Sequence, residues 1–183
     1  MKEIIIILIL SPFILVAQQY TEVVELPGTT ADQLYSTTQD LLSISFNEAH
    51  HIIQCDPAEK AILGKGITQI ECLISNTPVT MNVYFTVNTH FIDNKCIYDI
   101  QSSEISMTGG DRYSYKLLKE MGTKEGLKAF YKLKGIPVWM VGKRKFLQNM
   151  ESNQQLTAKV ENQLQGIMDE FALSLKKEIA ANN

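Results

Sequence analysis

The side chains with the most obvious chemistry in this sequence are the histidines, His50, His51 and His90. His90 stands close in sequence to Asp93 and Asp99, and an imidazole beside a carboxylate can serve as a general base. Neither a Gly-x-Ser-x-Gly nor a His-Glu-x-x-His spacing occurs in the chain. We therefore treat a hydrolase-type site near His90 as an alternative function, and we assign no catalytic residues.

The three cysteines, Cys55, Cys72 and Cys96, are the other candidates for chemistry. No Cys-x-x-Cys or Cys-x-x-His spacing is present, so we predict neither a metal site nor a cofactor. The odd number leaves at least one thiol without a partner in the same chain, and the sequence does not fix which. Each stands in an expected strand, and we predict that all three are small buried side chains.

A glycine pair, Gly64-Lys65-Gly66, superficially resembles a phosphate-binding loop, but the spacing of a P-loop and its following Ser or Thr are absent. The pair lies within an expected strand at 61–74, on the parity of the inner face. Two glycines there leave room for a crossing helix or a sharp bend. Gly166 interrupts a later helix, where we expect it to permit close approach to the sheet.

These side chains depend for their position on a strand at 79–91. Its apolar residues fall on one parity: Val79, Met81, Val83, Phe85, Val87 and Phe91. The other parity is mostly polar, which indicates one buried and one solvated face. Such a strand is typical of an antiparallel sheet that is covered on one side. The polar face from Tyr84 to His90 is the sheet surface on which we look for a site.

Neighbouring segments complete an antiparallel meander. The expected elements are strands at 20–26, 50–55 and 61–74 and a helix at 31–46. Thr30 and Gln33 have the spacing of a capping box at the start of that helix. In the strand after Asn94, the apolar positions change parity across residues 101–104, which predicts a β-bulge or a strong bend there.

After residue 110 the apolar period changes from two to about 3.6, which indicates helices. We expect helices near 113–121 and 123–135, then a long amphipathic helix at 156–179 that covers the buried face of the sheet. Residues 138–147 combine apolar side chains with three cations. We predict a helix or loop packed on the domain with its cations solvated, and the alternative is a location on a membrane surface.

The N-terminus is typical of a secretory signal. Lys2 precedes an apolar segment from Ile4 to Ala17, which is shorter than the roughly 20 residues of a bilayer span. We predict cleavage between Ala17 and Gln18, export to the periplasm or outer envelope, and no stable membrane span afterwards. Glu3 weakens the positive charge before the apolar segment, so an uncleaved anchor is the alternative.

The 183 residues, 45% of them hydrophobic, suffice for one domain with a proper core. We divide the chain into a signal segment at 1–17, a sheet domain with one helix at 18–110, and a helical region at 111–183 packed on the same core. Segment 18–110 holds 3 Lys and 11 acidic residues, whereas segment 111–183 holds 13 basic and 8 acidic residues.

The two opposite charges can attract one another within the fold, and a basic surface for anionic lipid or nucleic acid is the alternative. We predict no nucleic acid partner, because the strand-bearing segment lacks the cations that neutralise phosphates.

A strand ending in Pro27-Gly28, a helix containing Leu34-Tyr35 and the glycine-bearing stretch 61–66 occur in that order. This pattern resembles the exported Bacteroidota family called domain of unknown function 4468, over roughly residues 19–107. The resemblance implies an α+β, TBP-like fold, with a curved antiparallel sheet in β-α-β-β-β-β order and helices on one face. It supplies no catalytic residues, and a fold does not fix a function.

The large one-sided apolar face and the small residues Gly64 and Gly66 favour a non-catalytic binding or interaction module. Its site is expected in a groove between the long helix and the sheet, and its partner is an apolar ligand or another envelope protein. The alternatives are the hydrolase-type site near His90 and a purely structural envelope protein.

Overall fold

The computed structural model describes residues 20–45, 52–74, 77–107, 110 and 112–182. The predicted signal segment with Ala17 and Gln18 lies outside these residues, as do His50 and His51. The element order is β1-α1-β2-β3-β4-β5-β6-α2-α3-α4-α5, which confirms the predicted α+β class.

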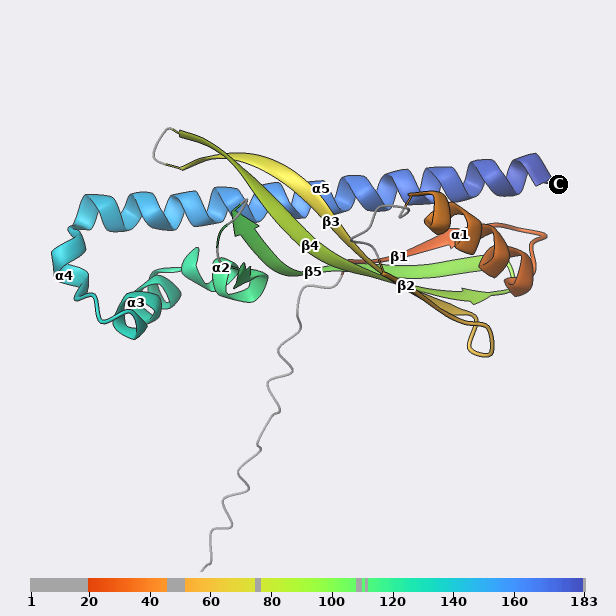
Figure 1. The fold of residues 1–183 in the computed structure, drawn as a ribbon, viewed down its shortest axis with the longest axis horizontal. Coiled ribbons are helices and arrows are strands. Elements are labelled where there is room, and N and C mark those ends of the chain that lie inside the picture. The colour runs from red at the N-terminus through yellow and green to blue at the C-terminus, as the bar shows by residue number, and fades with distance from the viewer. Residues whose placement is uncertain (1–19, 46–51, 75–76, 108–109, 111, 183) are drawn as a thin grey trace, which may run out of the picture.

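A six-stranded antiparallel sheet forms the centre of the molecule (Figure 1). Its order is β1-β5-β4-β3-β2, and β6 also pairs with β5. The strands are β1 (Tyr20–Glu25), β2 (Ile52–Asp56), β3 (Ala61–Ile74), β4 (Thr77–Ile92), β5 (Lys95–Met107) and β6 (Arg112–Ser114). The sequence predicted all of them except β6, because three residues are too few to reveal a period.

β4 lies in the middle of the sheet and has the predicted two faces. Its buried residues all share one parity: Met81, Val83, Phe85, Val87, Thr89 and Phe91. Thr89 is polar but satisfied, because its hydroxyl donates to the carbonyl oxygen of Ile62 at 3.1 Å. We call this face the inner face and the opposite one the outer face.

A bulge interrupts the pairing of β4 with β5. Tyr84 pairs with Glu104 and the next residue, Phe85, pairs with Ser102, so Ser103 is the extra residue. The bulge lies within the predicted stretch 101–104, and it returns Ile105 to the inner face, where it is buried.

The hairpin between β4 and β5 fixes the start of α1 (Ala31–Ser45). Asp93 accepts a hydrogen bond from the backbone N–H of Ala31 at 2.9 Å, and Asn94 accepts one from Gly28 at 2.7 Å. The capping box is also formed, since Gln33 accepts from the N–H of Thr30 at 2.9 Å. These contacts satisfy N–H groups that a helix start leaves free.

The last helix, α5 (Lys143–Asn182), runs the length of the molecule (Figure 1). Its 40 residues span about 60 Å. Its buried residues include Val160, Leu164, Met168 and Leu175, which pack with α1 on the inner face as predicted. Gly166 is exposed, and a Cβ at this position would meet no atom within 4 Å. The prediction that Gly166 permits close approach to the sheet is therefore wrong.

Three short helices lie between β6 and α5: α2 (Tyr115–Met121), α3 (Lys124–Leu133) and α4 (Val138–Val141). They confirm the predicted helices, and Thr123 caps α3 by accepting from the N–H of Gly126. Phe146 of α5 packs with Leu127 and Tyr131 of α3 in a second, smaller core.

Residues 138–147 are only partly packed on the domain. Val138 and Val141 are half-buried against the second core, but Trp139 and Met140 are exposed, so the prediction of a packed segment is wrong for these two. The three cations are exposed as expected. No helix within the described residues is long and apolar enough to cross a membrane.

Candidate functional site

The outer face of the sheet carries the site that the sequence indicated near His90. His90 is exposed on β4, opposite Ile97 of β5 and Ala61 of β3. Among the described residues no carboxylate is hydrogen-bonded to His90, because Asp93 caps α1 and Asp99 accepts from the side chain of Asn88 at 3.0 Å. The imidazole–carboxylate pair of the hydrolase alternative is therefore not formed.

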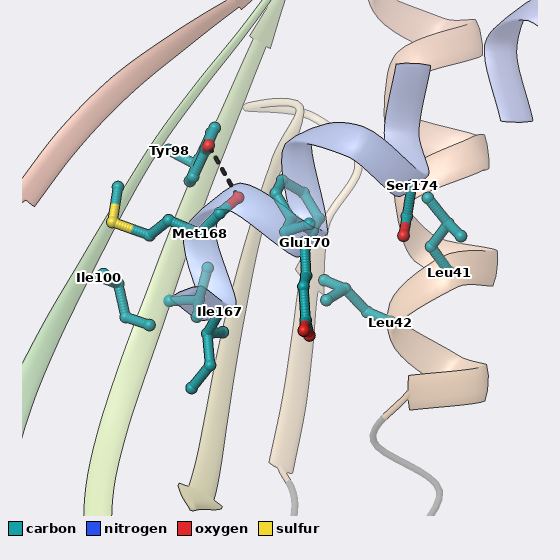
Figure 2. A pocket seen from close by; sticks show the side chains of 10 residues that line it. Leu41, Leu42, Tyr98, Ile100, Ile167, Met168, Glu170 and Ser174 are labelled. Carbon is teal, nitrogen blue, oxygen red and sulfur yellow. Dashed lines mark hydrogen bonds between the residues drawn. The ribbon is translucent and has the colours of Figure 1, made fainter. Parts of the chain in front are cut away.

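A small hollow of about 170 Å³ lies between α1, α5 and the inner face (Figure 2). The side chains labelled in Figure 2 include Leu41 and Leu42 of α1 and Ile167 of α5. Ligand pockets usually measure about 300–1,000 Å³, so this hollow is smaller than a usual ligand pocket. The apolar groove that the sequence predicted beside Gly64 and Gly66 is not here, since neither glycine lines the hollow.

A partly buried polar cluster lies beside the hollow, around Tyr98, which also lines it. The hydroxyl of Tyr98 lies 2.7 Å from Oε2 of Glu22 and 3.1 Å from the backbone oxygen of Met168. Its one proton serves one acceptor at a time. Gln165 donates to Oε1 of Glu22 at 2.8 Å, so a charged carboxylate on β1 joins the strand to α5.

The contacts within this cluster lower the pKa of Glu22 and raise the pKa of Tyr98. Hydrogen bonds from Tyr98 and Gln165 hold the pKa of Glu22 below its ordinary value, although partial burial opposes them. Burial raises the pKa of Tyr98, and the neighbouring Glu22 charge adds to the rise. Neither shift prepares a group for proton transfer near neutral pH, because the carboxylate stays charged and the phenol stays neutral.

A larger cavity lies further along α5, where the helix leaves the sheet. We call it the end groove, and it measures about 560 Å³. Its apolar lining comes from the ends of β3, β4 and β5, from β6, from the short helices α2 and α3 and from α5: Leu73, Met81, Ile105, Met107, Tyr113, Leu118, Met121, Leu127, Phe130 and Leu156. Most of the exposed lining is apolar, and three of these residues are methionines, which adapt to irregular ligands.

Polar side chains of α5 close one wall of the end groove. Asn149 donates to the hydroxyl of Tyr131 at 2.5 Å, and Asn153 donates to the backbone oxygen of Met121 at 3.3 Å. Outside the lining, Gln154 donates to the backbone oxygen of Gly122 at 2.7 Å. These amides hold α2 and α3 against α5, so the groove is a built feature of the fold.

Among the described residues, Lys159 is the only cation that lines the end groove. Its Nζ donates to the backbone oxygen of Glu71 at 2.7 Å, which fixes the ammonium at the rim beside the end of β3. An ammonium carries three donors, so two are left for another acceptor.

Residues 20–106 match the family model described as "Domain of unknown function (DUF4468) with TBP-like fold". These residues belong to that family. The family resemblance inferred from the sequence is thus confirmed over nearly the same range. The DUF4468 domain comprises the elements from β1 to β5.

Two solved structures are similar to the chain. One is a DUF4468 family protein from Bacteroides ovatus, with 16% identity, a TM-score of 0.45 and coverage of 52% of this chain and 59% of that chain. The other is a TBP-like protein from Parabacteroides distasonis, with 12% identity, a TM-score of 0.44 and coverage of 80% and 92%. The chain thus spans less than two thirds of the first structure. No curated protein matches the chain.

The end groove lies across the boundary of the DUF4468 domain. The lining residues of β3, β4 and β5 up to Ile105 belong to the domain, whereas Met107 and the walls from β6, α2, α3 and α5 follow residue 106. Sequence reasoning missed this site because it placed the groove at Gly64 and Gly66. The available signal was the set of apolar residues on α2 and α3, such as Met121 and Phe130.

The cysteines of the DUF4468 domain have different environments. Cys72 and Cys96 are buried as predicted, but Cys55 is exposed, because β2 is the edge strand of the sheet. All three thiols are free. Burial raises the pKa of Cys72 and raises the pKa of Cys96 to about 12, so neither is a ready nucleophile. No group of three or more metal-ligating side chains gathers within the described residues.

Proposed function

We propose that this protein is an exported, non-catalytic binding module of the cell envelope, and that the end groove holds a molecule with a long apolar tail and one carboxylate, such as a fatty acid. The proposal is carried by one observation: an apolar groove of about 560 Å³ at whose rim the described residues place one cation, Lys159. Its size falls in the usual range of ligand pockets, and its few polar groups suit orientation of a ligand more than catalysis.

The lining supports an acyl chain in particular. Met81, Met107 and Met121 contribute flexible thioethers from three different elements, which suits a chain with many conformers. Leu73 and Met107 are exposed at the mouth, so the apolar lining is open to a ligand from solution.

The rim supports an acid as the head group. Lys159 has two donors that its bond to Glu71 leaves unused, and the nearby amides on α5 offer neutral partners. A carboxylate at the rim gains a charge-assisted hydrogen bond while the tail is buried.

Export is part of the proposal and rests on the sequence. The apolar segment at 4–17, with Lys2 before it, has the pattern of a cleavable signal, which would place the domain in the periplasm or at the outer envelope. The competing role, a purely structural one, requires that the groove take no ligand.

Titration calorimetry with palmitate tests the function. We expect binding with a negative heat-capacity change, which marks burial of apolar surface. Met107→Glu places a charge at the mouth of the groove and should weaken palmitate binding at least about tenfold. Leu173→Glu is the matched control, because Leu173 is 69% exposed on α5 and does not line the groove.

Lys159→Gln separates the head group from the tail. It should weaken palmitate binding several-fold and leave binding of the uncharged alcohol hexadecanol unchanged, since the alcohol has no charge to pair. Equal palmitate affinity in the native protein, Met107→Glu and Leu173→Glu, or no binding at all, would refute the proposal.

A further inference from the structure

We propose that the α3–α4 corner docks on the surface of an anionic phospholipid bilayer. Four large apolar side chains are exposed there, Leu133, Ile136, Trp139 and Met140, and we call them the corner surface. Trp139 is 82% exposed and Met140 is 64% exposed. The inference concerns a surface outside the end groove, and it does not depend on the proposed ligand.

The one-turn helix α4 divides its side chains between two environments. Val138 and Val141, three residues apart, are half-buried against the second core of Leu127, Tyr131 and Phe146. The two residues between them, Trp139 and Met140, therefore point away from that core. The exposure follows from the helical period and is not an effect of a frayed end.

Turns at both ends fix this display. Gly135 after α3 has a φ of 67°, and Gly142 after α4 has a φ of 75°, both in the left-handed region that glycine adopts readily. The N–H of Ile136 donates to the carbonyl oxygen of Tyr131 at 2.8 Å, which closes the end of α3. The backbone conformation of these two turns therefore holds the side chain of Trp139 away from the second core.

The charge around the corner surface identifies the partner. Between Lys124 and Lys145 the chain carries seven Lys and Arg residues and one acid, Glu125. All seven cations are exposed, and none forms an ion pair with a described residue. Exposed cations beside tryptophan and aliphatic side chains are the combination that binds anionic lipid headgroups and the apolar layer beneath them.

The position of the corner permits such contact. α3 and α4 lie at the end of the molecule opposite the C-terminus, beyond the strands of the sheet (Figure 1). A flat bilayer can therefore reach the corner surface without meeting the sheet. A second copy of the chain is the other conceivable cover, but it would bring the same cations together, and like charges repel.

Trp139 is the only tryptophan of the chain, so its fluorescence reports on the corner surface alone. The full-length protein is titrated with vesicles of phosphatidylethanolamine and phosphatidylglycerol, and in parallel with vesicles of phosphatidylcholine. We expect a blue shift of the emission with the anionic vesicles, a much weaker one with phosphatidylcholine, and loss of the shift at high salt.

Variants separate the charge from the apolar contact. The triple change Lys143→Gln, Arg144→Gln and Lys145→Gln should lower partitioning into anionic vesicles roughly 100-fold, at about fivefold for each cation. Met140→Glu should lower it at least about tenfold. Leu173→Glu, a matched change elsewhere on α5, should leave it unchanged. Any binding through the N-terminal apolar segment is common to all of these proteins.

The inference is overturned if the emission of Trp139 stays unshifted with anionic vesicles, or if neutral vesicles shift it equally. It is also overturned if the shift occurs without vesicles and grows with protein concentration in step with dimer formed in analytical ultracentrifugation, because a second copy then covers the corner. Palmitate binding to the corner variants should equal that of the native protein, so failure here leaves the end groove untouched.

Discussion

The two halves of α5 meet different environments, although they belong to one continuous helix. From Val160 to Ile179 its buried residues lie against the inner face and α1, and Leu164, Met168 and Leu175 are almost fully buried. From Lys143 to Lys159 the helix passes the end of the sheet and borders the end groove and the corner. The C-terminal half closes a core, whereas the N-terminal half leaves apolar surface for a partner. The proposed binding role is therefore assigned to the region where α5 extends past the sheet.

The largest effect expected from this difference concerns leucines on the two halves. Leu164→Ala should destabilise the protein by about 2–5 kcal/mol, because its neighbours cannot fill the cavity. Leu156→Ala, on the wall of the end groove, should cost only about 1 kcal/mol, since that side chain is half-buried beside a space that already exists. Urea unfolding of both variants measures the two costs. Equal costs would mean that the groove is packed as tightly as the core.

A pair of glycines gives the next largest contrast. A Cβ on Gly126 of α3 would lie within 2.1 Å of the backbone oxygen of Glu120, whereas one on Gly166 of α5 would meet nothing within 4 Å. We expect Gly126→Ala to destabilise by about 1–3 kcal/mol. Gly166→Ala should stabilise by about 0.5–1 kcal/mol, because alanine is the better helix former. Thermal unfolding gives both signs, and a destabilised Gly166→Ala would restore the close approach that the sequence first predicted.

A smaller effect tests the polar contact between Tyr98 and Glu22, which lies beside the C-terminal half of α5. Tyr98→Phe removes the hydroxyl beside Glu22 and should cost about 1 kcal/mol at neutral pH. The pKa of Glu22 is lowered in the folded protein, so its contribution is present above the ordinary value of 4.5 and is lost as the pH falls through the lower, folded value.

Urea midpoints measured between about pH 3 and pH 6 follow this loss. The variant should lose less stability on acidification than the native protein, because the pKa of Glu22 moves back toward its ordinary value. Parallel pH profiles for the native protein and the variant would show that Tyr98 does not lower the pKa of Glu22.

Most of the fold could be predicted because its signals are local. The parity of β4, the change of parity before Ile105 and the spacing of Thr30 and Gln33 each arise within a few residues, and the structure forms the strand, the bulge and the cap that they indicate. The long helix followed from a repeated step of three to four apolar residues.

The candidate site depended on information that no single stretch contains. Cys55 is exposed because β2 lies at the sheet edge. The alternation of residues along β2 does not reveal the place of this strand in the sheet. Asp93 caps α1 because the β4–β5 hairpin lies beside the start of that helix. The nearness of Asp93 to His90 in the sequence therefore did not lead to a hydrogen bond between them. The end groove exists because α2 and α3 pack against α5 beyond the sheet, which the helical period cannot reveal.

Methyl NMR of the methionines distinguishes an open end groove from the packed core, because methionines lie in both regions. Met81, Met107 and Met121 line the end groove, whereas Met168 is buried in the filled half of the molecule. On addition of palmitate, we expect shifts of the methyl signals of Met81, Met107 and Met121 and an unchanged signal for Met168. Unchanged signals for the three groove methionines, or a shift of Met168 alone, would contradict it.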